Sequence, residues 1–570
     1  MLYHIMPHFN WFGRGRPLQI AIMVTCQLAF ILFGYDQGVF SGIVRNPDWL
    51  KTFGHPGSGL EGIIVSIYNL VLASFIEARV PETDDRQGAF SGCILAFLGG
   101  EKAGRRMSMW IAMVFIIVGA ILQTTSYGVP QILVARYITG IGTGIETSTV
   151  PMYQSELVEA HKRGRVVSSE PLFVGVGIVI AYFFDYGIAY AGGPIAWRLP
   201  IACQIIFAIV VIVMVFGVPE SPRYLYKEGR NEEALQVLCD VYDGTPEDEK
   251  IAREQKGILD ALAMERAHGE YKWSQIFKQD EVQTGRRVLL AYGMQFMNQI
   301  GGINLVVCVY LHSTAACSRL LTRSRYYVPT ALETNVGLTR NLSLLIGGFV
   351  QCCFFIGSLV PTFFLDKMGR RRPMMWGSLG LAISMMLIAI LLSFTPERGY
   401  SDSVKTATSS AAVTFFFTYM LCFGASANCI PWVYVPEILP LHARAKGTAI
   451  GVSSNWLWNF VVVMITPTLL NNLQWQAYLI FMCTNLAFIP LVYFCYPETS
   501  NLTLEEVDFL FIKDGSKGIH KFTGPSQPVR ISLSGDVEQG ARRMMHGEKG
   551  EKRGSEGGAA FVEDVDKVEK

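Results

Sequence analysis

Long apolar runs separated by short polar segments recur along most of the chain. Runs such as 107–123, 201–218, 373–392 and 477–496 approach or reach the ~20 residues with which a helix crosses ~30 Å of hydrocarbon. Inside lipid, each backbone N–H and C=O must be hydrogen-bonded within the spanning structure, and a helix meets this requirement. The pattern therefore predicts an all-α membrane protein with about twelve transmembrane helices. They are expected near 18–44, 60–98, 107–124, 129–153, 166–190, 197–218, 288–310, 343–365, 373–393, 411–435, 447–470 and 475–496.

Composition and charge agree with this pattern. With 570 residues, of which 51% are hydrophobic and 17% charged, the chain is too long and too apolar for one soluble domain. Basic residues are concentrated in alternate loops, so the positive-inside rule predicts that both termini are cytoplasmic. The basic loops contain Lys102, Arg105, Arg106, His161, Lys162, Arg163, Arg165, Lys367, Arg370, Arg371, Arg372, Arg444 and Lys446. We expect a multi-pass protein of the plasma membrane.

The polar segments divide the chain into parts. The charged segment 219–287 predicts a few short amphipathic helices on the cytoplasmic side. The segment 497–570 is rich in Gly, Ser, Lys and Glu and predicts a mostly disordered cytoplasmic tail. Residues 1–17 form a short cytoplasmic N-terminus. The two remaining parts, 18–218 and 288–496, each contain six of the predicted helices.

The predicted spans carry no cluster of residues typical of catalysis or metal binding. The twelve cysteines fall mostly inside apolar runs, with no Cys-x-x-Cys pair and no histidine at a metal-ligand spacing, so buried, inert thiols are expected. No nucleophile–base pair appears either, so the chain is not expected to be an enzyme. We predict no metal, no cofactor and no nucleic-acid partner. The lipid bilayer is an expected partner.

The loops carry an internal repeat. EKAGRR (101–106) follows the second predicted helix and DKMGRR (366–371) follows the eighth, with an acid and Gly-Arg-Arg at the same offset. After the fourth and tenth helices a glutamate precedes an arginine by seven residues in both halves. Topogenic charge alone would explain the basic residues but not the paired acids. The repeat predicts two six-helix bundles related by an axis along the membrane normal, with a substrate path between them.

These motifs resemble those of the sugar porter family of the major facilitator superfamily, in its fungal branch. The similarity spans roughly 18–510 and includes PESPRY at 219–224 and PETSNLTLEEVD at 497–508. The resemblance implies alternating access, in which the two halves rock about a central site. It also implies a cytoplasmic gate of exposed ion pairs, each worth only ~0–1 kcal/mol, so that the gate can open. The candidate gate residues are Glu101, Arg105, Glu156, Arg163, Glu220, Asp366, Arg370, Glu437, Arg444 and Glu498.

Asp36 and Arg136 lie inside predicted spans, where a charge costs about 2.5–3.5 kcal/mol at mid-helix. At ~1.5 Å per residue both lie on the order of 10 Å below the outer surface, so they are placed to meet. In sugar porters an Asp at this position marks proton-coupled members, and facilitators usually carry Asn. A carboxylate beside Arg can alternate between an ionised, paired form and a protonated form, as coupling requires. The alternative is a static ion pair that joins two helices.

Sugar recognition needs amides, which donate and accept hydrogen bonds, and an aromatic face for the apolar side of the ring. On the predicted seventh helix, Asn298, Gln299 and Asn304 match the Gln-Gln…Asn set of sugar porters, with Asn in place of the first Gln. Several amides on one helix favour a wet cavity over helix–helix hydrogen bonds, which are the alternative. The candidate substrate-binding residues are Gln295, Asn298, Gln299, Asn304, Tyr326, Tyr327, Trp432, Asn455 and Asn459.

Three positions depart from the family pattern. Pro171 stands where the family often has Gln, Phe354 stands where it often has Asn, and Asn428-Cys429 replaces a Gly-Pro pair. These departures weaken the expectation of a hexose. They make a polyol or another polyhydroxylated solute credible.

Two segments interrupt predicted helices. Deleting 71–87 rejoins a second helix of about 20 residues. Deleting 308–325 places Tyr326 and Tyr327 four and five positions after Asn304, where sugar porters carry a Tyr-Tyr pair. Our hypothesis is that both segments are retained introns translated in frame; genuine loop insertions would put charges or unsatisfied backbone in the bilayer. If the chain is made as written, we expect poor folding and no transport.

The residues and the resemblance together predict a proton-coupled monosaccharide symporter, expected to be a monomer. Three alternatives remain open. They are a polyol or glycerol symporter, an uncoupled sugar facilitator, and a non-transporting nutrient sensor of the same fold.

Overall fold

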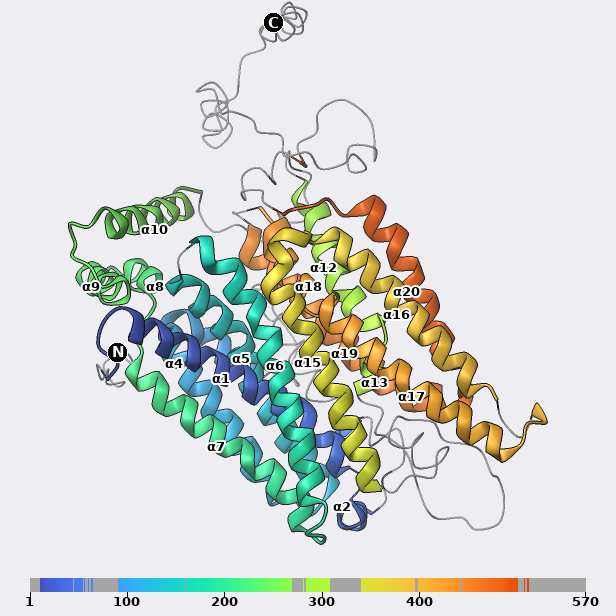
Figure 1. The fold of residues 1–570 in the computed structure, drawn as a ribbon. Coiled ribbons are helices and arrows are strands. Elements are labelled where there is room, and N and C mark those ends of the chain that lie inside the picture. The colour runs from blue at the N-terminus through green and yellow to red at the C-terminus, as the bar shows by residue number, and fades with distance from the viewer. Residues whose placement is uncertain are drawn as a thin grey trace, which may run out of the picture. The chain divides into compact units, whose positions relative to one another are not determined.

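The computed structural model describes residues 11–44, 46–54, 56, 60, 63–64, 91–158, 160–268, 280, 283–307, 340–394, 398–440, 443–500, 507 and 510–511. The chain separates into two units, Met1–Thr523 and Gly524–Lys570, and every described residue belongs to the first unit. The described residues form helices and no strand (Figure 1). The segments 71–87 and 308–325 lie outside the described residues, so the retained-intron hypothesis stays a prediction.

The helices follow the predicted order. The first half contains α1 (Arg16–Ile43), α2 (Pro47–Thr52), α4 (Ser91–Thr124), α5 (Val129–Leu157), α6 (Ala160–Ile188) and α7 (Ile195–Gly217). The connecting segment contains α8 (Pro222–Lys227), α9 (Asn231–Tyr242) and α10 (Glu249–His268). The second half contains α12 (Thr284–Ile300), α13 (Ile303–Val307), α15 (Arg340–Met368), α16 (Arg371–Leu392), α17 (Asp402–Ala425), α18 (Ile430–Ile438), α19 (Arg444–Leu473) and α20 (Gln476–Cys495).

Apolar length and surface both fit a membrane protein. Among the described residues, eight helical stretches are long and apolar enough to cross a membrane. They are Arg16–Phe40, Gly104–Thr124, Ser169–Ile188, Ile195–Gly217, Leu345–Leu365, Arg371–Leu392, Ser403–Ile438 and Gln476–Cys495. Large apolar side chains such as Ile206, Phe363 and Trp376 lie on the outside, more than 60% exposed. Such a surface is stable where hydrocarbon replaces water.

Glycine makes the turn between spans in both halves. Helix α4 is broken at Gly104, which has φ 80° and ψ 173°, so its first part completes the second predicted span and its second part is the third. Gly369, at the matching place between α15 and α16, has φ 77°. Positive φ is costly for residues with a Cβ, so the Gly of each Gly-Arg-Arg is required by the turn itself.

Two predicted helices are interrupted. The predicted helix 288–310 breaks at Gly302, whose φ is 95°, and the predicted helix 411–435 begins at Asp402 and breaks between α17 and α18. Breaks inside a membrane leave carbonyls that must find new donors. The Gly301 carbonyl accepts from the Tyr419 hydroxyl at 2.9 Å and from Asn485 Nδ2 at 2.8 Å. Polar side chains of neighbouring helices therefore make the first break possible.

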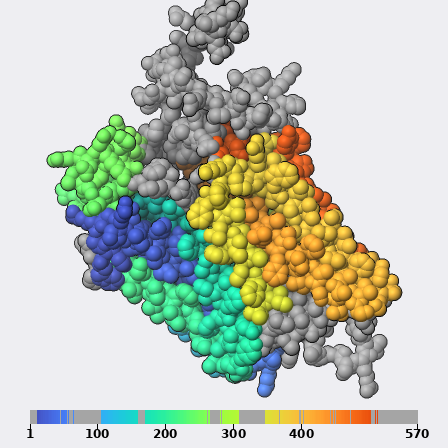
Figure 2. All heavy atoms as spheres, in the orientation of Figure 1, coloured from blue at the N-terminus to red at the C-terminus, as the bar shows by residue number. Residues whose placement is uncertain are grey.

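The helices of each half pack closely, and α6 joins the halves through α15. Figure 2 shows the teal spheres of α6 against the yellow spheres of α15. At this contact the rings of Phe183 and Phe349 meet edge to face, with centroids 5.6 Å apart. Inside the first half, a Cβ on Gly34 would come within 2.0 Å of the Val174 carbonyl oxygen, so α1 and α6 touch backbone to backbone. Small residues allow this approach in membrane helices.

Candidate proton and substrate sites

Asp36 and Arg136 meet inside the first half. The two residues are 2% and 3% exposed, on α1 and α5. Nη1 of Arg136 donates to Oδ1 of Asp36 at 3.2 Å and to Oδ2 at 3.5 Å. The guanidinium also lies over the Phe40 ring, with Cζ 4.0 Å from the ring centroid. The carboxylate and the ring face together stabilise a cation that is hidden from water.

Gln204 on α7 completes this site. Its Nε2 donates to Oδ1 of Asp36 at 2.9 Å, and the side chain is fully buried. Sequence reasoning missed Gln204, although an amide inside the apolar run IACQIIFAIVV was the available signal. Both partners of Asp36 donate hydrogen bonds, so this arrangement stabilises the ionised carboxylate, which only accepts.

Three further carboxylates are buried in the described helices of the first half, and one of them, Asp185, is 3% exposed. Glu146 on α5 is 2% exposed and Glu170 on α6 is 5% exposed. Among the described residues, neither oxygen of Glu146 has a hydrogen-bond partner, and Oε1 of Glu170 has none. Beside Glu170, Gln27 Nε2 donates to Ser169 Oγ at 3.0 Å. These acids were not predicted as site residues, although an acid inside a span is itself a signal of function.

The second half contains a cluster of amides instead. Gln299 is at its centre, because its Nε2 donates to Oδ1 of Asn298 and to Oδ1 of Asn455, both at 3.0 Å. Asn304 Nδ2 donates to Gln299 Oε1 at 2.8 Å, and Asn455 Nδ2 donates to Gln295 Oε1 at 2.8 Å. All five side chains are buried. The structure thus brings five of the predicted substrate residues into one polar network, called here the amide cluster.

Some polar atoms at the amide cluster have hydrogen-bond partners among the described residues, and others have none. Nδ2 of Asn298 donates to the Ala427 carbonyl at 2.6 Å, at the break between α17 and α18, so Asn298 also stabilises that break. Among the described residues, Nε2 of Gln295 and Oδ1 of Asn459 have no hydrogen-bond partner. Asn459 lies one helical turn after Asn455, on the same face of α19. The cluster and its neighbour Asn459 therefore contain one buried donor and one buried acceptor without a described partner.

Aromatic rings connect the amide cluster to the first half. Trp432 on α18 and Trp456 on α19, next to Asn455, have ring centroids 6.4 Å apart. Trp456 also meets Phe33 of α1 edge to face, with centroids 5.6 Å apart. Trp432, a predicted substrate residue, thus belongs to an aromatic group shared by both halves. Tyr326 and Tyr327 lie outside the described residues.

The Gly-Arg-Arg loops build the same corner twice, at what we call the basic end of the bundle. In the first half Arg105 Nη2 is 3.1 Å from Glu156 Oε1, and the Arg105 backbone N–H donates to Glu220 Oε1 at 2.9 Å. In the second half Arg370 Nη2 is 2.8 Å from Glu437 Oε1, and the Arg370 N–H donates to Glu498 Oε1 at 2.8 Å.

Hydroxyl groups complete each corner in the same way. Ser221 Oγ donates to Glu156, and Thr499 Oγ1 donates to Glu437 at 2.7 Å. Tyr153 and Tyr434 each donate to a proline carbonyl, at 2.6 and 2.8 Å. The pseudo-repeat seen in the loops is therefore a repeat of hydrogen bonds.

The predicted gate differs from the structure in one respect. The pairs were expected to be exposed, yet the side chains of Arg105 and Glu156 are 18% and 8% exposed, and those of Arg370 and Glu437 are 7% and 21% exposed. Each pair joins two residues of the same half, so neither pair connects the two halves. Arg444 donates to the Leu439 carbonyl at 3.4 Å. The side chains of Glu101, Arg163 and Asp366 lie outside the described part of the structure.

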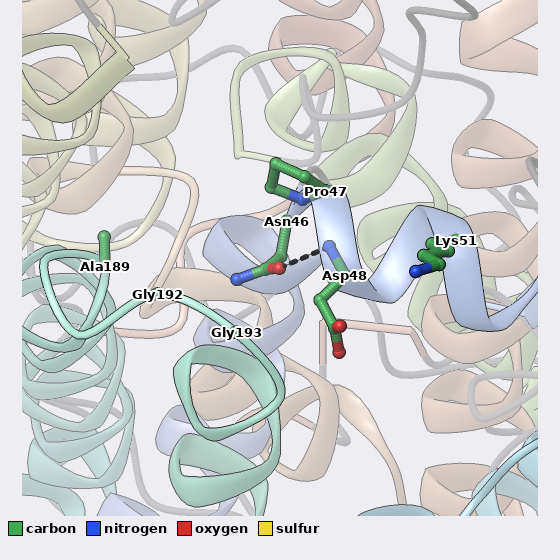
Figure 3. Close-up of a pocket in the computed structure, with 7 residues that line it drawn as sticks. All are labelled: Asn46, Pro47, Asp48, Lys51, Ala189, Gly192 and Gly193. Carbon is green, nitrogen blue, oxygen red and sulfur yellow. Dashed lines mark hydrogen bonds between the residues drawn. The ribbon is translucent and has the colours of Figure 1, made fainter.

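A cavity of about 430 Å³ lies elsewhere, between the α1–α2 and α6–α7 connections (Figure 3). Its lining residues are Asn46, Pro47, Asp48, Lys51, Ala189, Gly192 and Gly193. Asp48 also accepts from Trp197 Nε1 at 3.0 Å, which fixes α2 on α7. Among the described residues, no predicted substrate residue lines this cavity, so it is separate from the amide cluster.

Comparison with known proteins identifies the family. Residues 21–511 match the family model described as "Sugar (and other) transporter", so the chain belongs to this family of the major facilitator superfamily. The MFS-type transporter oryC of Aspergillus oryzae is 34% identical over 506 residues, covering 87% of this chain and 86% of that protein. The sugar transporter STL1 of Saccharomyces cerevisiae is 29% identical over 548 residues, covering 94% of this chain and 88% of that protein.

A solved structure shows the same fold. The proton:xylose symporter XylE of E. coli, bound to 6-bromo-6-deoxy-D-glucose, superposes with a TM-score of 0.67 at 24% identity, covering 87% of this chain and 99% of XylE. The predictions of an all-α, multi-pass membrane protein with the twelve-helix major facilitator fold and of membership in the sugar porter family are confirmed. The family and fold are those of transporters, not of enzymes.

Proposed function

We propose that this protein is a proton-coupled symporter of a monosaccharide that works by alternating access. The observation that carries the proposal is the buried triad of Asp36, Arg136 and Gln204. Protonation of this carboxylate removes the charge that attracts Arg136 and weakens both hydrogen bonds, so proton binding is coupled to helix movement. The family supports a sugar as substrate, and XylE is named as a proton:xylose symporter.

In the proposed cycle, Asp36 binds a proton from outside while the amide cluster binds the sugar. Protonation removes the negative charge that Arg136 and Gln204 hold, and α1 is then free to move against α5 and α7. The proton and the sugar leave at the basic end, and the ion pair forms again. The basic loops support a cytoplasmic position for this end and for both termini, and we propose that the protein lies in the plasma membrane.

A polyol such as glycerol is the second candidate substrate, because of Phe354. This residue stands where sugar porters often have Asn, and it is 5% exposed. Its ring stacks on Phe423 with centroids 6.0 Å apart, and it lies beside Gly175 of α6. A ring here removes one polar contact and fills space at the joint between the halves, which favours a smaller solute.

The test is uptake of labelled hexoses, pentoses, glycerol and other polyols in a transport-null host, with and without a proton gradient. The full chain and a chain lacking 71–87 and 308–325 are compared. We expect accumulation of one of these solutes that collapses when the gradient is removed. Uptake that ignores the gradient and survives Asp36→Asn would show a facilitator instead, and no uptake by either chain would favour a nutrient sensor.

A further inference from the structure

Glu146 is a buried acid to which the proposed cycle gives no role. Its side chain is 2% exposed, and neither carboxylate oxygen has a hydrogen-bond partner among the described residues. An ionised carboxylate buried without donors is far less stable than a protonated one, because nothing replaces the water that the charge has lost. The geometry at Glu146 is therefore that of a neutral carboxylic acid.

Along α5, Glu146 lies between the Asp36 site and the basic end. It lies ten residues after Arg136 and ten before Glu156. At ~1.5 Å per residue it is about 15 Å from each along the helix, midway between the Asp36 site and the corner at the basic end. A proton that travels from Asp36 to the basic end therefore passes the level of Glu146.

The groups around Glu146 show which charge acts on it. Helix α5 packs against α1, α4, α6 and α8. Among the described side chains of these helices, the titratable ones between the level of Asp36 and the basic end include Tyr35 and Cys26 on α1, Glu170 on α6, Arg105 and Arg106 on α4, and Tyr224 on α8. Burial has the larger effect on the charge of Glu146, and the negative charge of Asp36 adds to it. Two acids that sense each other and are both buried are more stable with one charge than with two.

We propose that Glu146 is a second proton-carrying carboxylate of the transport cycle, which receives the proton that Asp36 gives up and releases it at the basic end. This inference rests on the proposed function. The described structure, with Asp36 held by two donors and Glu146 without any, is the arrangement expected after the proton has moved between them. In the release step the O–H bond of Glu146 breaks, the proton passes to water at the basic end, and a carboxylate remains.

The experiment uses purified protein in liposomes, with the full chain and the chain lacking 71–87 and 308–325 in parallel. Counterflow, in which labelled and unlabelled solute exchange without net proton movement, is compared with uptake driven by a proton gradient. Glu146→Gln keeps the shape and cannot release a proton. We expect counterflow near the wild-type rate and a loss of gradient-driven accumulation of about 5- to 150-fold, the usual range of coupling between two sites.

Glu170→Gln is the matched control, because Glu170 is a buried acid of the same half on another helix. It is expected to keep gradient-driven accumulation. If Glu146→Gln accumulates solute with the wild-type level and pH dependence, the inference is overturned. The proposed function is tested separately, by Asp36→Asn. If Glu146→Gln also loses counterflow, Glu146→Asp is measured to separate a proton carrier from a structural carboxylate. Gradient-driven uptake restored in Glu146→Asp supports a proton carrier. Loss of counterflow in both variants shows a structural carboxylate and overturns the inference.

Discussion

The two halves of this transporter are alike at the basic end and different inside the membrane. At the basic end, Arg105 and Arg370 make the same ion pair with a glutamate and the same backbone bond to a second glutamate. Inside the membrane, the first half buries an ion pair and Glu146, which has no hydrogen-bond partner among the described residues, and the second half buries a network of amides. In the proposed transport cycle this difference separates two roles: the first half contains the proton site, and the second half contains the solute site.

The largest effect is expected for Asp36→Asn. The change leaves Arg136 buried without its carboxylate, and breaking a buried ion pair typically costs about 3–5 kcal/mol. We expect gradient-driven accumulation to disappear, and thermal stability in detergent to fall. The measurement is accumulation of labelled solute against its gradient, with protein amount checked on the membrane. Full accumulation in this variant would place the proton site elsewhere and remove the proposed division between the halves.

A large effect on binding is expected for Gln299→Ala in the second half. The change removes the partner of Asn298, Asn304 and Asn455 at once, and each unsatisfied buried group costs about 1–3 kcal/mol. We expect weaker solute binding with an unchanged pH dependence, measured as the concentration for half-maximal uptake at several pH values. The control is Asn428→Ala, an amide outside the cluster that donates to Ser358 at 3.2 Å. A shifted pH profile in Gln299→Ala would contradict the separation of proton and solute sites.

An intermediate and equal effect is expected at the two corners of the basic end. Arg105→Lys and Arg370→Lys keep the charge but lose the two-pronged contact with glutamate, which is worth about 1.5–3 kcal/mol per charged hydrogen bond. We expect slower transport with similar solute affinity in both variants, measured as maximal rate and half-saturation. An unequal loss of transport rate in the two variants would show that only one of the two corners controls opening at the basic end. Lys405, half-buried on the first turn of α17, offers a control for a basic charge outside the corners as Lys405→Gln.

A smaller effect is expected for Gly34→Ala, which tests packing inside one half. The added Cβ would lie 2.0 Å from the Val174 carbonyl oxygen, and overpacking typically costs about 1–3 kcal/mol. We expect a lower unfolding temperature in detergent without a change in coupling. Gly187→Ala is the matched control, because no atom lies within 4 Å of its Cβ position. Equal stability of the two variants would show that α1 and α6 can separate without cost.

The smallest effect is expected for Phe354→Asn, which restores the residue that sugar porters often carry. The ring now packs against Phe423 and Gly175, so an amide would open space and add one polar contact. We expect the ratio of hexose to polyol uptake to rise by about tenfold at most, because one neutral hydrogen bond contributes only ~0.5–1.5 kcal/mol. An unchanged ratio would remove Phe354 as a determinant of solute size.

Much of the fold was predictable because the bilayer imposes it. Apolar runs of spanning length must be helices, and their bounds agree with α1, α5, α7, α16 and α20 within a few residues. The breaks at Gly302 and after Ala425 were not predicted. A break is tolerated only when donors such as Tyr419 and Asn485 reach the freed carbonyls, and these residues come from distant parts of the chain.

The sequence by itself determined the repeat, the charged residues of the two corners and the polar residues inside the spans. A membrane tolerates such polar residues only where they are paired or functional. Each of these is a local pattern with a known cost in lipid. The tertiary structure decided which of them meet: Gln204 with Asp36, Asn455 with Gln299, and no described partner for Glu146. The reason is physical, since the stability of a buried polar group depends on the donors and acceptors that neighbouring helices bring to it, and helix packing places them.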